Sequence, residues 1–460
     1  MTKKILIIKQ AYTEQVIKKL EMHDAQSVEN MLNTASNLHK KGYLPAYQRL
    51  EILQKLANLV TDEHESFAQL IANEGGKPLK DARIEVTRAI DGIHIAIAGI
   101  RNIKGEQIPM DLTQAGMQRL AFTVMEPIGV VVAVSAFNHP LNLIIHQVVP
   151  AIATGCPVIV KPAEVTPLCA LRFAQLAIKA GLPEGYLQVA LTDRENSEKL
   201  VTDSRVAFFS FIGSAQVGWV LKSKLAPGVR CALEHGGVAP LIFDECSDMD
   251  GFIAGVVKAG FYHAGQVCVS VQRVFVPKNK AKEIAKKIAN VASQLIVGDA
   301  IDEVTDVGPL ILPKEVDRVE AWVNQAIAEG ATLITGGKRI NSVSYEPTVL
   351  LNPSNHSKVS NQEIFGPVIC IYDYFDISEA IEVANSLEVS FQASIFSDNI
   401  TTAMNSAKAL SASAVMINDY TTFRVDWTPF AGRKHSGYGV GGINHTMHDM
   451  LEHKMIVIKH

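Results

Sequence analysis

The sequence is poor in cysteine, has no long hydrophobic run and carries no excess of positive charge. Its six cysteines in 460 residues form no CxxC pair and show no His/Cys spacing typical of a metal site, so we expect reduced thiols, no bound metal and a cytoplasmic protein. The apolar run at 5–8 is too short for a secretory signal peptide, and the run at 128–134 is far too short to span a membrane. Lys and Arg total 43 against 47 Asp and Glu, which leaves no basic surplus for binding nucleic acid.

Other absences narrow the class of protein. There are no tandem repeats and no low-complexity segment, and hydrophobic residues make up 48% of the chain against 20% charged residues. This composition is close to that of an average globular protein, and it excludes a mainly disordered chain, a collagen and a small disulfide-stapled domain. A length of 460 residues is enough for about three domain-sized units.

What the sequence does contain is an alternation of helix and strand patterns. Residues 44–72 and 82–101 have the apolar spacing of helices, and the GGKP segment at 75–78 separates them. From Ile128 a continuous, mostly β-branched run predicts a strand buried on both faces. The alternation continues with helices at 141–153, 168–180 and 195–202 and strands at 157–160, 186–190 and 206–211. Repeated strand–helix–strand units predict a parallel, doubly wound sheet.

A second alternating series starts near Pro240 and predicts a second α/β unit. Its helices are expected at 250–263, 279–295 and 377–386, and its strands at 271–276, 368–374, 393–396 and 414–417. Residues 109–127 fit neither series, because they are polar and irregular. The apolar C-terminal end, 455–460, is expected to form a strand that has no partner nearby in the sequence and that can pair with another subunit.

Two segments carry side chains suited to covalent catalysis. In 261–268, Cys268 follows a Gly-Gln bend and can lie near a helix start, which would stabilise its thiolate; the alternative is a buried structural cysteine. In 233–237, Glu234 stands between an apolar strand and two glycines, as a general base in a tight loop would; the alternative is an ordinary strand-end glutamate.

Further segments have features suited to binding a nucleotide. FIGS at 211–214 leaves a buried strand and opens a helix, where backbone N–H groups can meet a phosphate, although no GxGxxG fingerprint is present. SAFNHP at 135–140 and KPAE at 161–164 each follow a buried strand, at the position where ligands of open α/β sheets bind. Taken alone, each of these segments is equally compatible with a plain strand-to-helix turn.

Together these segments resemble the aldehyde dehydrogenase superfamily, from about residue 30 to the end of the chain. The matching motifs occur in the family's order: AFNHP at 136–140, KPAE at 161–164, FIGS at 211–214, LEHGG at 233–237, GQVC at 265–268, EIFGP at 363–367, PFAG at 429–432 and SGYG at 436–439. The resemblance implies an α/β aldehyde dehydrogenase fold that assembles as a homodimer or homotetramer. Its parts would be a Rossmann-like NAD(P)-binding domain (1–108 and 128–236), an α/β catalytic domain (237–440) and a small β oligomerisation arm (109–127 and 441–460).

The resemblance also implies catalytic and cofactor roles. Cys268 would attack the aldehyde to give a thiohemiacetal, and Asn138 with the Cys268 backbone N–H would stabilise the oxyanion. Glu234 would activate the water that hydrolyses the thioester. The residues implied at the cofactor are Ser135, Ala136, Lys161, Pro162, Glu164, Gly213, Ser214, Val217, Gly236, Glu363 and Phe365. Glu164 on the adenosine ribose favours NAD, with NADP as the alternative.

Two positions depart from the family pattern. The stretch 190–197 has no glycine where the family usually has a glycine-bearing loop, which puts the adenine pocket in question. His235 replaces a small or apolar residue beside Glu234, and it is either an ordinary hydrogen-bonded side chain or a catalytic proton relay.

Arg88, His139 and Arg424 stand at positions that line the substrate tunnel in this family. They suggest an anionic aldehyde, because an arginine fork binds phosphonate, sulfonate, phosphate or carboxylate. FNHPLNL and HAGQVCVSVQR are most similar to the phosphonoacetaldehyde, sulfolactaldehyde, lactaldehyde and non-phosphorylating glyceraldehyde-3-phosphate dehydrogenases. The alternative is that Arg88 pairs with a nearby carboxylate such as Glu85, and Arg424 with Asp426, which leaves no anion site.

The predicted function is therefore oxidation of a small anionic or hydroxylated aldehyde to the carboxylic acid with NAD(P)+ reduction, with no nucleic-acid or membrane partner. Alternatives are a broad-range dehydrogenase of neutral aldehydes, a CoA-acylating enzyme, a catalytically silent NAD-binding protein and a thioester hydrolase without redox chemistry. Glu234 argues against the CoA-acylating enzyme, and Cys268, Glu234 and Asn138 together argue against the silent protein.

Overall fold

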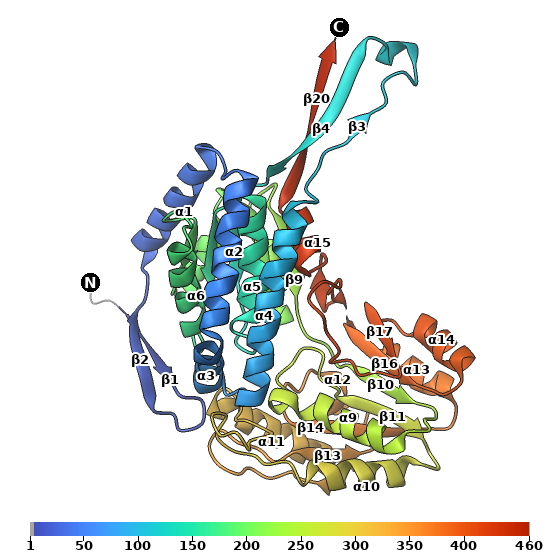
Figure 1. Cartoon of the computed structure of the whole chain (residues 1–460). Helices are drawn as coiled ribbons and strands as arrows, with labels where there is room; N and C mark the ends of the chain where they lie inside the picture. Colours follow the sequence, from blue (N-terminus) through green and yellow to red (C-terminus); the bar gives the residue numbers. More distant parts are fainter. Residues whose placement is uncertain (1–3, 460) are drawn as a thin grey trace.

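The computed structural model describes residues 4–459 and shows two α/β bodies from which a narrow β arm projects (Figure 1). The first body holds a six-stranded sheet in the order β19-β9-β8-β5-β6-β7. Its strands are β5 (Val130–Val134), β6 (Val158–Lys161), β7 (Leu187–Val189), β8 (Val206–Ile212), β9 (Arg230–Glu234) and the short β19 (Gly437–Tyr438). Neighbours are parallel except β19, which pairs antiparallel with β9. The predicted parallel, doubly wound sheet is confirmed.

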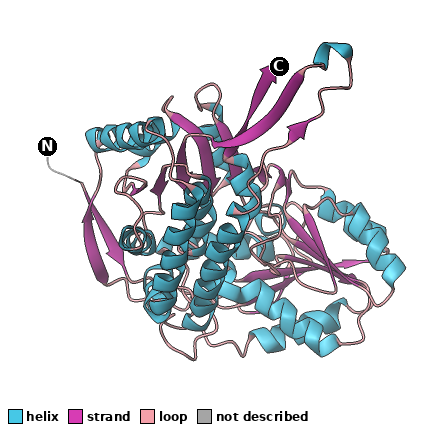
Figure 2. Cartoon of the chain, turned by 45° about the horizontal axis from the view of Figure 1, so that its top comes forward, coloured by secondary structure: helices cyan, strands magenta, loops and turns pink. Residues whose placement is uncertain are grey.

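Helices cover both faces of this sheet (Figure 2), and its strands are apolar on both sides for that reason. Val131 and Ala133 pack into one apolar cluster and Val130 and Val132 into another. The helices are α1 (Ala25–Lys40), α2 (Ala46–Asp62), α3 (His64–Gly75), α4 (Leu79–Ile100), α5 (Asn142–Thr154), α6 (Leu168–Lys179), α7 (Arg194–Thr202) and α8 (Ala215–Ser223). The predicted helices are confirmed, whereas α1 and the hairpin of β1 (Ile5–Lys9) and β2 (Val16–Glu21) are additional. No helix within residues 4–459 is long and apolar enough to cross a membrane.

Two buried glutamates join the N-terminal helices to the sheet. Glu74 accepts two backbone N–H bonds, of 2.9 and 3.0 Å, at the start of α6. Glu85 accepts two more, of 3.0 and 3.1 Å, at the start of α5, and it forms an ion pair with the buried Lys77. These N–H groups have no partner within their own helices, so the glutamates satisfy donors that would otherwise be buried unpaired.

The second body holds a seven-stranded sheet in the order β12-β13-β14-β11-β10-β16-β17, parallel except for the edge strand β12. Its strands are β10 (Pro240–Phe243), β11 (Arg273–Pro277), β12 (Thr332–Thr335), β13 (Thr348–Leu351), β14 (Val368–Tyr374), β16 (Gln392–Phe396) and β17 (Ala414–Ile417). Its helices are α9 (Met249–Phe261), α10 (Ala281–Ala292), α11 (Pro313–Ala328), α12 (Lys358–Asn361), α13 (Ile377–Asn385) and α14 (Ile400–Ala409). The predicted helices and strands of the second series are confirmed, and α11, α14, β12 and β13 add to them.

The arm is a three-stranded sheet that reaches away from both bodies (Figure 1). β4 (Arg119–Pro127) and β20 (Leu451–Lys459) pair antiparallel in register along their whole length, and β3 (Gln107–Ile108) lies on the other side of β4. The prediction that 109–127 is irregular is therefore wrong for residues 119–127, because their partner strand lies at the far end of the chain. Within the segment expected to form the arm, α15 (Ile443–Asp449) packs against α4 and α5 instead. The predicted tail strand is confirmed up to Lys459, whereas residue 460, like residues 1–3, lies outside the described residues.

Candidate active site

One cavity of about 1270 Å³ lies between the two bodies, at the carboxyl ends of β5, β6, β8 and β9. Its wall combines the turns after these strands with side chains from three segments of the second body, 262–269, 363–365 and 420–430. This is the edge at which ligands of open α/β sheets bind. Every residue that the sequence singles out for catalysis, cofactor or substrate lines this cavity except Pro162, which is buried beside Lys161.

Cys268 lies in a turn between α9 and β11. α9 ends in the 3-10 turn Tyr262–Gly265, which contains three consecutive residues with positive φ. The prediction that Cys268 lies near a helix start is wrong, because the cysteine follows the C-terminal end of α9 and precedes a strand. Burial raises the pKa of the Cys268 thiol, and the carboxyls of Glu363 and Glu234 raise it further. The resting thiol is protonated, so nucleophilic attack requires a proton acceptor.

Gln266 anchors the turn that carries the thiol. Its Nε2 donates to the carbonyls of His263 (3.2 Å) and Pro309 (3.1 Å), and its Oε1 accepts from the Ile311 N–H at 2.9 Å. Asn138 Nδ2 donates to the Gln266 carbonyl at 2.9 Å, which ties the turn to the first body. The Asn138 amide has a second N–H, which remains available to an oxyanion. The sequence reasoning overlooked Gln266, although it lies within the GQVC motif.

Glu234 is the last residue of β9, opposite Gly437 of β19. Gly441, which forms a β-bridge with Phe430, also lies against the Glu234 carboxylate. A Cβ on Gly441 would stand 1.9 Å from Glu234 Oε1. Burial raises the pKa of Glu234 to about 7, and the Arg424 guanidinium opposes this shift. A carboxyl group with a pKa near neutrality suits a general base.

Glu363 lies in the turn after α12 and has a buried Oε1 without a hydrogen-bond partner in the described chain. Burial raises the pKa of Glu363 to about 8. A Cβ on Gly236 would stand 1.7 Å from this oxygen, so the LEHGG motif needs a glycine there. An orphaned carboxylate oxygen on a cavity wall is a ready acceptor for a ligand hydroxyl group.

The other end of the cavity fits a dinucleotide. Lys161 ends β6 and lies 3.5 Å from Glu164, which is half exposed. α8 begins after Ser214, and no side chain caps its N-terminus, so its first N–H groups are available to a phosphate. Lys161, Glu164 and Glu363 therefore offer one cation and two carboxylates that can bind ribose hydroxyls. The uncapped N-terminus of α8 lies on the wall of the same cavity.

α11 adds Glu315, Arg318 and Trp322 to the same wall, with the Arg318 guanidinium 4.8 Å from the Trp322 ring centre. Nothing in the sequence pattern marked these three residues. Arg318 also lowers the pKa of Glu363, against the larger effect of burial.

The substrate residues are arranged differently from either sequence-based expectation. Arg88 pairs with Asp426 through two hydrogen bonds, Nε to Oδ2 at 3.0 Å and Nη2 to Oδ1 at 2.7 Å. Arg88 thus pairs with a carboxylate, as the alternative expected, but not with Glu85, because Glu85 is committed to Lys77 and α5. The expected pair of Arg424 with Asp426 is wrong, because Asp426 is committed to Arg88 and His146. Arg424 instead donates through Nη1 to the carbonyl and hydroxyl of one residue, Thr428, at 2.9 Å each.

His139 lines the cavity but is not a cation at neutral pH. Burial lowers its pKa well below the usual value, and the nearby Lys77 and Arg88 lower it further. His139 can therefore act as a hydrogen-bonding group, whereas the two arginines supply the positive charge on this side of the cavity.

His235 holds the turn between β8 and α8. Its Nδ1 lies 2.8 Å from the Gly213 carbonyl and must donate there, while its buried Nε2 has no partner in the described chain. The ring packs between Phe211 and Trp219, with centroids 5.7 and 5.9 Å away. These contacts favour the ordinary hydrogen-bonded side chain over the proton relay. The glycine-free stretch 190–197 contributes no residue to the cavity.

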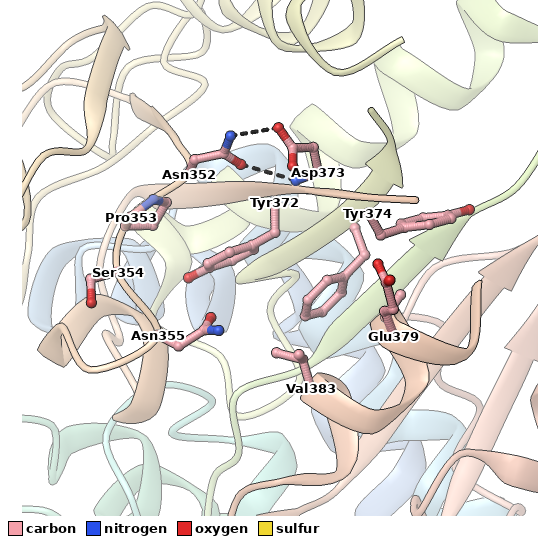
Figure 3. Close-up of a pocket in the computed structure, with 11 residues that line it drawn as sticks. Asn352, Pro353, Ser354, Asn355, Tyr372, Asp373, Tyr374, Glu379 and Val383 are labelled. Atoms are coloured by element: carbon pink, nitrogen blue, oxygen red, sulfur yellow. Dashed lines mark hydrogen bonds between the residues drawn. The ribbon is translucent and has the colours of Figure 1, made fainter. Parts of the chain in front are cut away.

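A second hollow, of about 340 Å³, lies beside β14 (Figure 3). Asn352 and Asp373 hydrogen-bond to each other at its rim, at 2.7 and 2.9 Å. The hydroxyls of Tyr372 and Tyr374 donate to Ser360 and to the Phe243 carbonyl. These four side chains are thus paired within the protein, and none of the predicted site residues lines the hollow.

The whole chain is similar to known proteins. The chain matches the model of the aldehyde dehydrogenase family over residues 2–456. It is 38% identical over 449 residues to 3-sulfolactaldehyde dehydrogenase from Priestia megaterium, a match that covers 97% of this chain and 93% of that protein.

Two solved structures superpose on nearly the whole chain. Aldehyde dehydrogenase 21 from Physcomitrella patens, in complex with the reaction product succinate, gives a TM-score of 0.96 at 34% identity, over 99% of this chain and 95% of that one. A glyceraldehyde-3-phosphate dehydrogenase from Methanocaldococcus jannaschii, complexed with NADP, gives 0.94 at 34% identity, over 100% of both chains. The similarity to these two structures therefore extends over both bodies and the arm.

Proposed function

Because the chain belongs to the aldehyde dehydrogenase family, has its fold and is an NAD(P)-dependent aldehyde dehydrogenase, we propose that it oxidises a small anionic or hydroxylated aldehyde to the carboxylic acid. One observation carries the proposal: Cys268, Asn138 and Glu234 meet in a single cavity that also holds two arginines. A catalytically silent protein would have no need to keep a thiol, a carboxyl group and an amide together on the wall of one cavity.

In the proposed mechanism, Cys268 Sγ bonds to the aldehyde carbon while its proton passes to solvent, which leaves the Glu234 carboxylate free to act as the base in the later hydrolysis. The second N–H of the Asn138 amide and the Cys268 backbone N–H stabilise the oxyanion of the thiohemiacetal. NAD(P)+, when bound, supplies the hydride acceptor. Glu234 then removes a proton from the water that attacks the Cys268 thioester, which releases the carboxylic acid and restores the thiol.

The cofactor is proposed to lie along the wall from Lys161 to Glu363. Lys161 and Glu164 would hold the adenosine ribose, the uncapped start of α8 the pyrophosphate, and Glu363 the nicotinamide ribose. Glu164 would repel a 2′-phosphate, so we propose NAD as the preferred cofactor with NADP as the alternative.

Arg424 supports a charged substrate. Its guanidinium lies 4.2 Å from the Phe430 ring centre and uses only Nη1 in hydrogen bonds to described residues, so Nε and Nη2 remain for a ligand. The relatives' names mention sulfolactaldehyde, succinate and glyceraldehyde 3-phosphate, all of which are anionic in water. A broad-range dehydrogenase of neutral aldehydes remains the competing proposal, since family membership alone is equally compatible with it.

The test is NADH absorbance with purified enzyme and equal concentrations of phosphonoacetaldehyde, glyceraldehyde 3-phosphate, lactaldehyde, succinate semialdehyde and propanal. We expect one of the anionic or hydroxylated aldehydes to be oxidised at least about tenfold more efficiently than propanal, a difference that one charge-assisted contact can supply. Best turnover with propanal would overturn the substrate class. Identification of the product separates the acid from an acyl-CoA, and stoichiometric NADH excludes a plain thioester hydrolase.

We also propose that the enzyme is a cytoplasmic homo-oligomer assembled through the arm. Met455 and Val457 of β20 are 59% and 44% exposed, and the outer edge of β20 has no strand partner in the described chain. The six cysteines are all free thiols, which fits a reducing compartment. Light scattering of the intact protein tests the assembly, and a monomer would contradict it.

A further inference from the structure

Asp426 controls the charge on the substrate side of the cavity. It is 3% exposed, and its Oδ1 accepts from both Arg88 Nη2 and His146 Nε2 at 2.7 Å, while Oδ2 accepts from Arg88 Nε. Burial alone would raise the pKa of Asp426, but the hydrogen bonds from His146 and Arg88 hold it well below its usual range. The carboxylate is therefore ionised at any working pH, and it cancels the charge of Arg88.

Arg424 has no such partner. Its hydrogen bonds go to neutral oxygens of Thr428, and no carboxylate within residues 4–459 lies in ion-pair contact with it. Burial lowers the pKa of Arg424, and the nearby Asp426 and Glu234 carboxyls oppose that shift. Among the described residues, Arg424 thus carries the one guanidinium charge on this wall that has no counterion.

None of the remaining titratable groups adds net positive charge to this side of the cavity. Asp81 and Lys258 line the same side with opposite charges. Burial lowers the pKa of both His139 and His146, so both imidazoles are neutral near pH 7. Glu234 is neutral below a pKa of about 7 and negative above it, so it never adds positive charge.

Resting on the proposed function, we propose that Asp426 determines specificity by limiting the anion site to at most one uncompensated positive charge. The site then suits an aldehyde with a monoanionic head group, a carboxylate or sulfonate, better than one with a dianionic phosphate. A second buried negative charge would find no counterion, which is costly in a low-dielectric site. Arg88 still contributes Nη1, which has no bond to a described residue, as a donor for a head-group oxygen or a hydroxyl.

The test compares kcat/KM for succinate semialdehyde, a monoanion, with that for glyceraldehyde 3-phosphate at pH 8, where the phosphate is dianionic. The wild-type enzyme should favour succinate semialdehyde. Asp426→Asn keeps the size of the side chain and frees the charge of Arg88, so the ratio should move toward the phosphate by about tenfold or more. Asp81→Asn removes a negative charge from the same cavity away from Arg88, and it should move the ratio far less.

Two outcomes overturn the inference while sparing the proposed function: an unchanged ratio in a folded Asp426→Asn enzyme, or an equal shift in Asp81→Asn. Best turnover of propanal by the wild type would instead overturn the proposed substrate class. If Asp426→Asn does not fold, Arg88→Gln provides the second test. It leaves the Asp426 charge uncompensated beside Arg424, so both anionic aldehydes should lose at least about tenfold relative to propanal, the dianion most. An equal loss for all three aldehydes would contradict the charge argument.

Discussion

Glu74 and Glu85 in the first body are buried and Glu234 and Glu363 at the cavity are partly buried, and the two pairs are held in opposite ways. The first two, the framework glutamates, each accept two backbone N–H bonds at a helix start, and Glu85 also pairs with Lys77. The other two are the cavity glutamates. Glu234 receives no hydrogen bond on its carboxylate from residues 4–459, and Glu363 keeps a buried oxygen without a partner.

The pKa does not separate these pairs. Burial raises the pKa of Glu74 to about 7, as it does for Glu234. What differs is the use of the oxygens, because a satisfied carboxylate holds a helix in place while an unsatisfied one remains available to water or a ligand. We therefore expect the framework glutamates to matter for unfolding and the cavity glutamates for turnover.

The largest effect should come from Cys268, which the cavity glutamates flank. Cys268→Ala should reduce NADH formation by about 10⁴-fold or more, because no other group can form the thioester. Its urea unfolding should stay close to that of the wild type. Cys246→Ala, which changes a thiol in a loop outside the cavity, is the matched control and should retain the wild-type rate. Full activity of Cys268→Ala would rule out the covalent mechanism.

Glu234→Gln should lower kcat by about 10²–10⁴-fold, since the amide cannot accept a proton from the hydrolytic water. Its free energy of unfolding should not fall, because the substitution removes a carboxyl without a hydrogen-bond partner. Single-turnover kinetics should show that acyl-enzyme accumulates while NADH still forms. A variant that loses stability but keeps its rate per folded molecule would place Glu234 with the framework glutamates.

Glu85→Gln should lower stability and leave the catalytic rate nearly unchanged, which is the reverse of Glu234→Gln. It leaves Lys77 buried without a counterion, so the free energy of unfolding should fall by about 3–5 kcal/mol. Activity per folded molecule at low temperature should remain near the wild-type value. The exposed Asp91→Asn in the same helix is the control and should change stability by less than about 0.5 kcal/mol.

The pH profile of the rate should follow Glu234. Its pKa of about 7 means that the carboxylate, the form that acts as base, increases as the pH rises through neutrality. Below this pKa, kcat should rise by up to about tenfold per pH unit and level off above it. Measuring kcat from pH 5.5 to 8.5 tests this, and an unchanged inflection in Glu234→Gln would assign the titration to another group.

Stability should also depend on pH through Glu363. The folded state raises the pKa of Glu363 from the ordinary value of 4.5 to about 8, so it binds this proton more tightly than the unfolded chain does. Stability from this group is present below pH 4.5 and is lost as the pH rises toward 8, at no more than about 1.4 kcal/mol per unit. The unfolding free energy of Glu363→Gln minus that of the wild type should therefore grow over this range. A constant difference would show that the carboxyl is not desolvated.

Much of the fold was accessible to sequence reasoning because its signals are local. The strands of the first sheet are continuous β-branched runs, since helices cover both faces, and each run is recognisable without its neighbours. Sequence reasoning could also group the site residues that follow strands, because parallel strands place their carboxyl ends at one edge of the sheet. The arm was implied only by the family resemblance and not by local signals, because residues 119–127 become a strand only through pairing with 451–459.

By itself, the sequence determined the family, the order of the two α/β bodies and the side chains expected to act in catalysis, cofactor binding and substrate binding. Only the tertiary structure decided how those side chains are paired. Arg88 meets Asp426 across 338 positions of sequence, and not the nearby Glu85, because Glu85 is already committed to Lys77 and to the start of α5. The net charge of the substrate pocket is therefore set by packing, because packing decides which carboxylate neutralises each arginine.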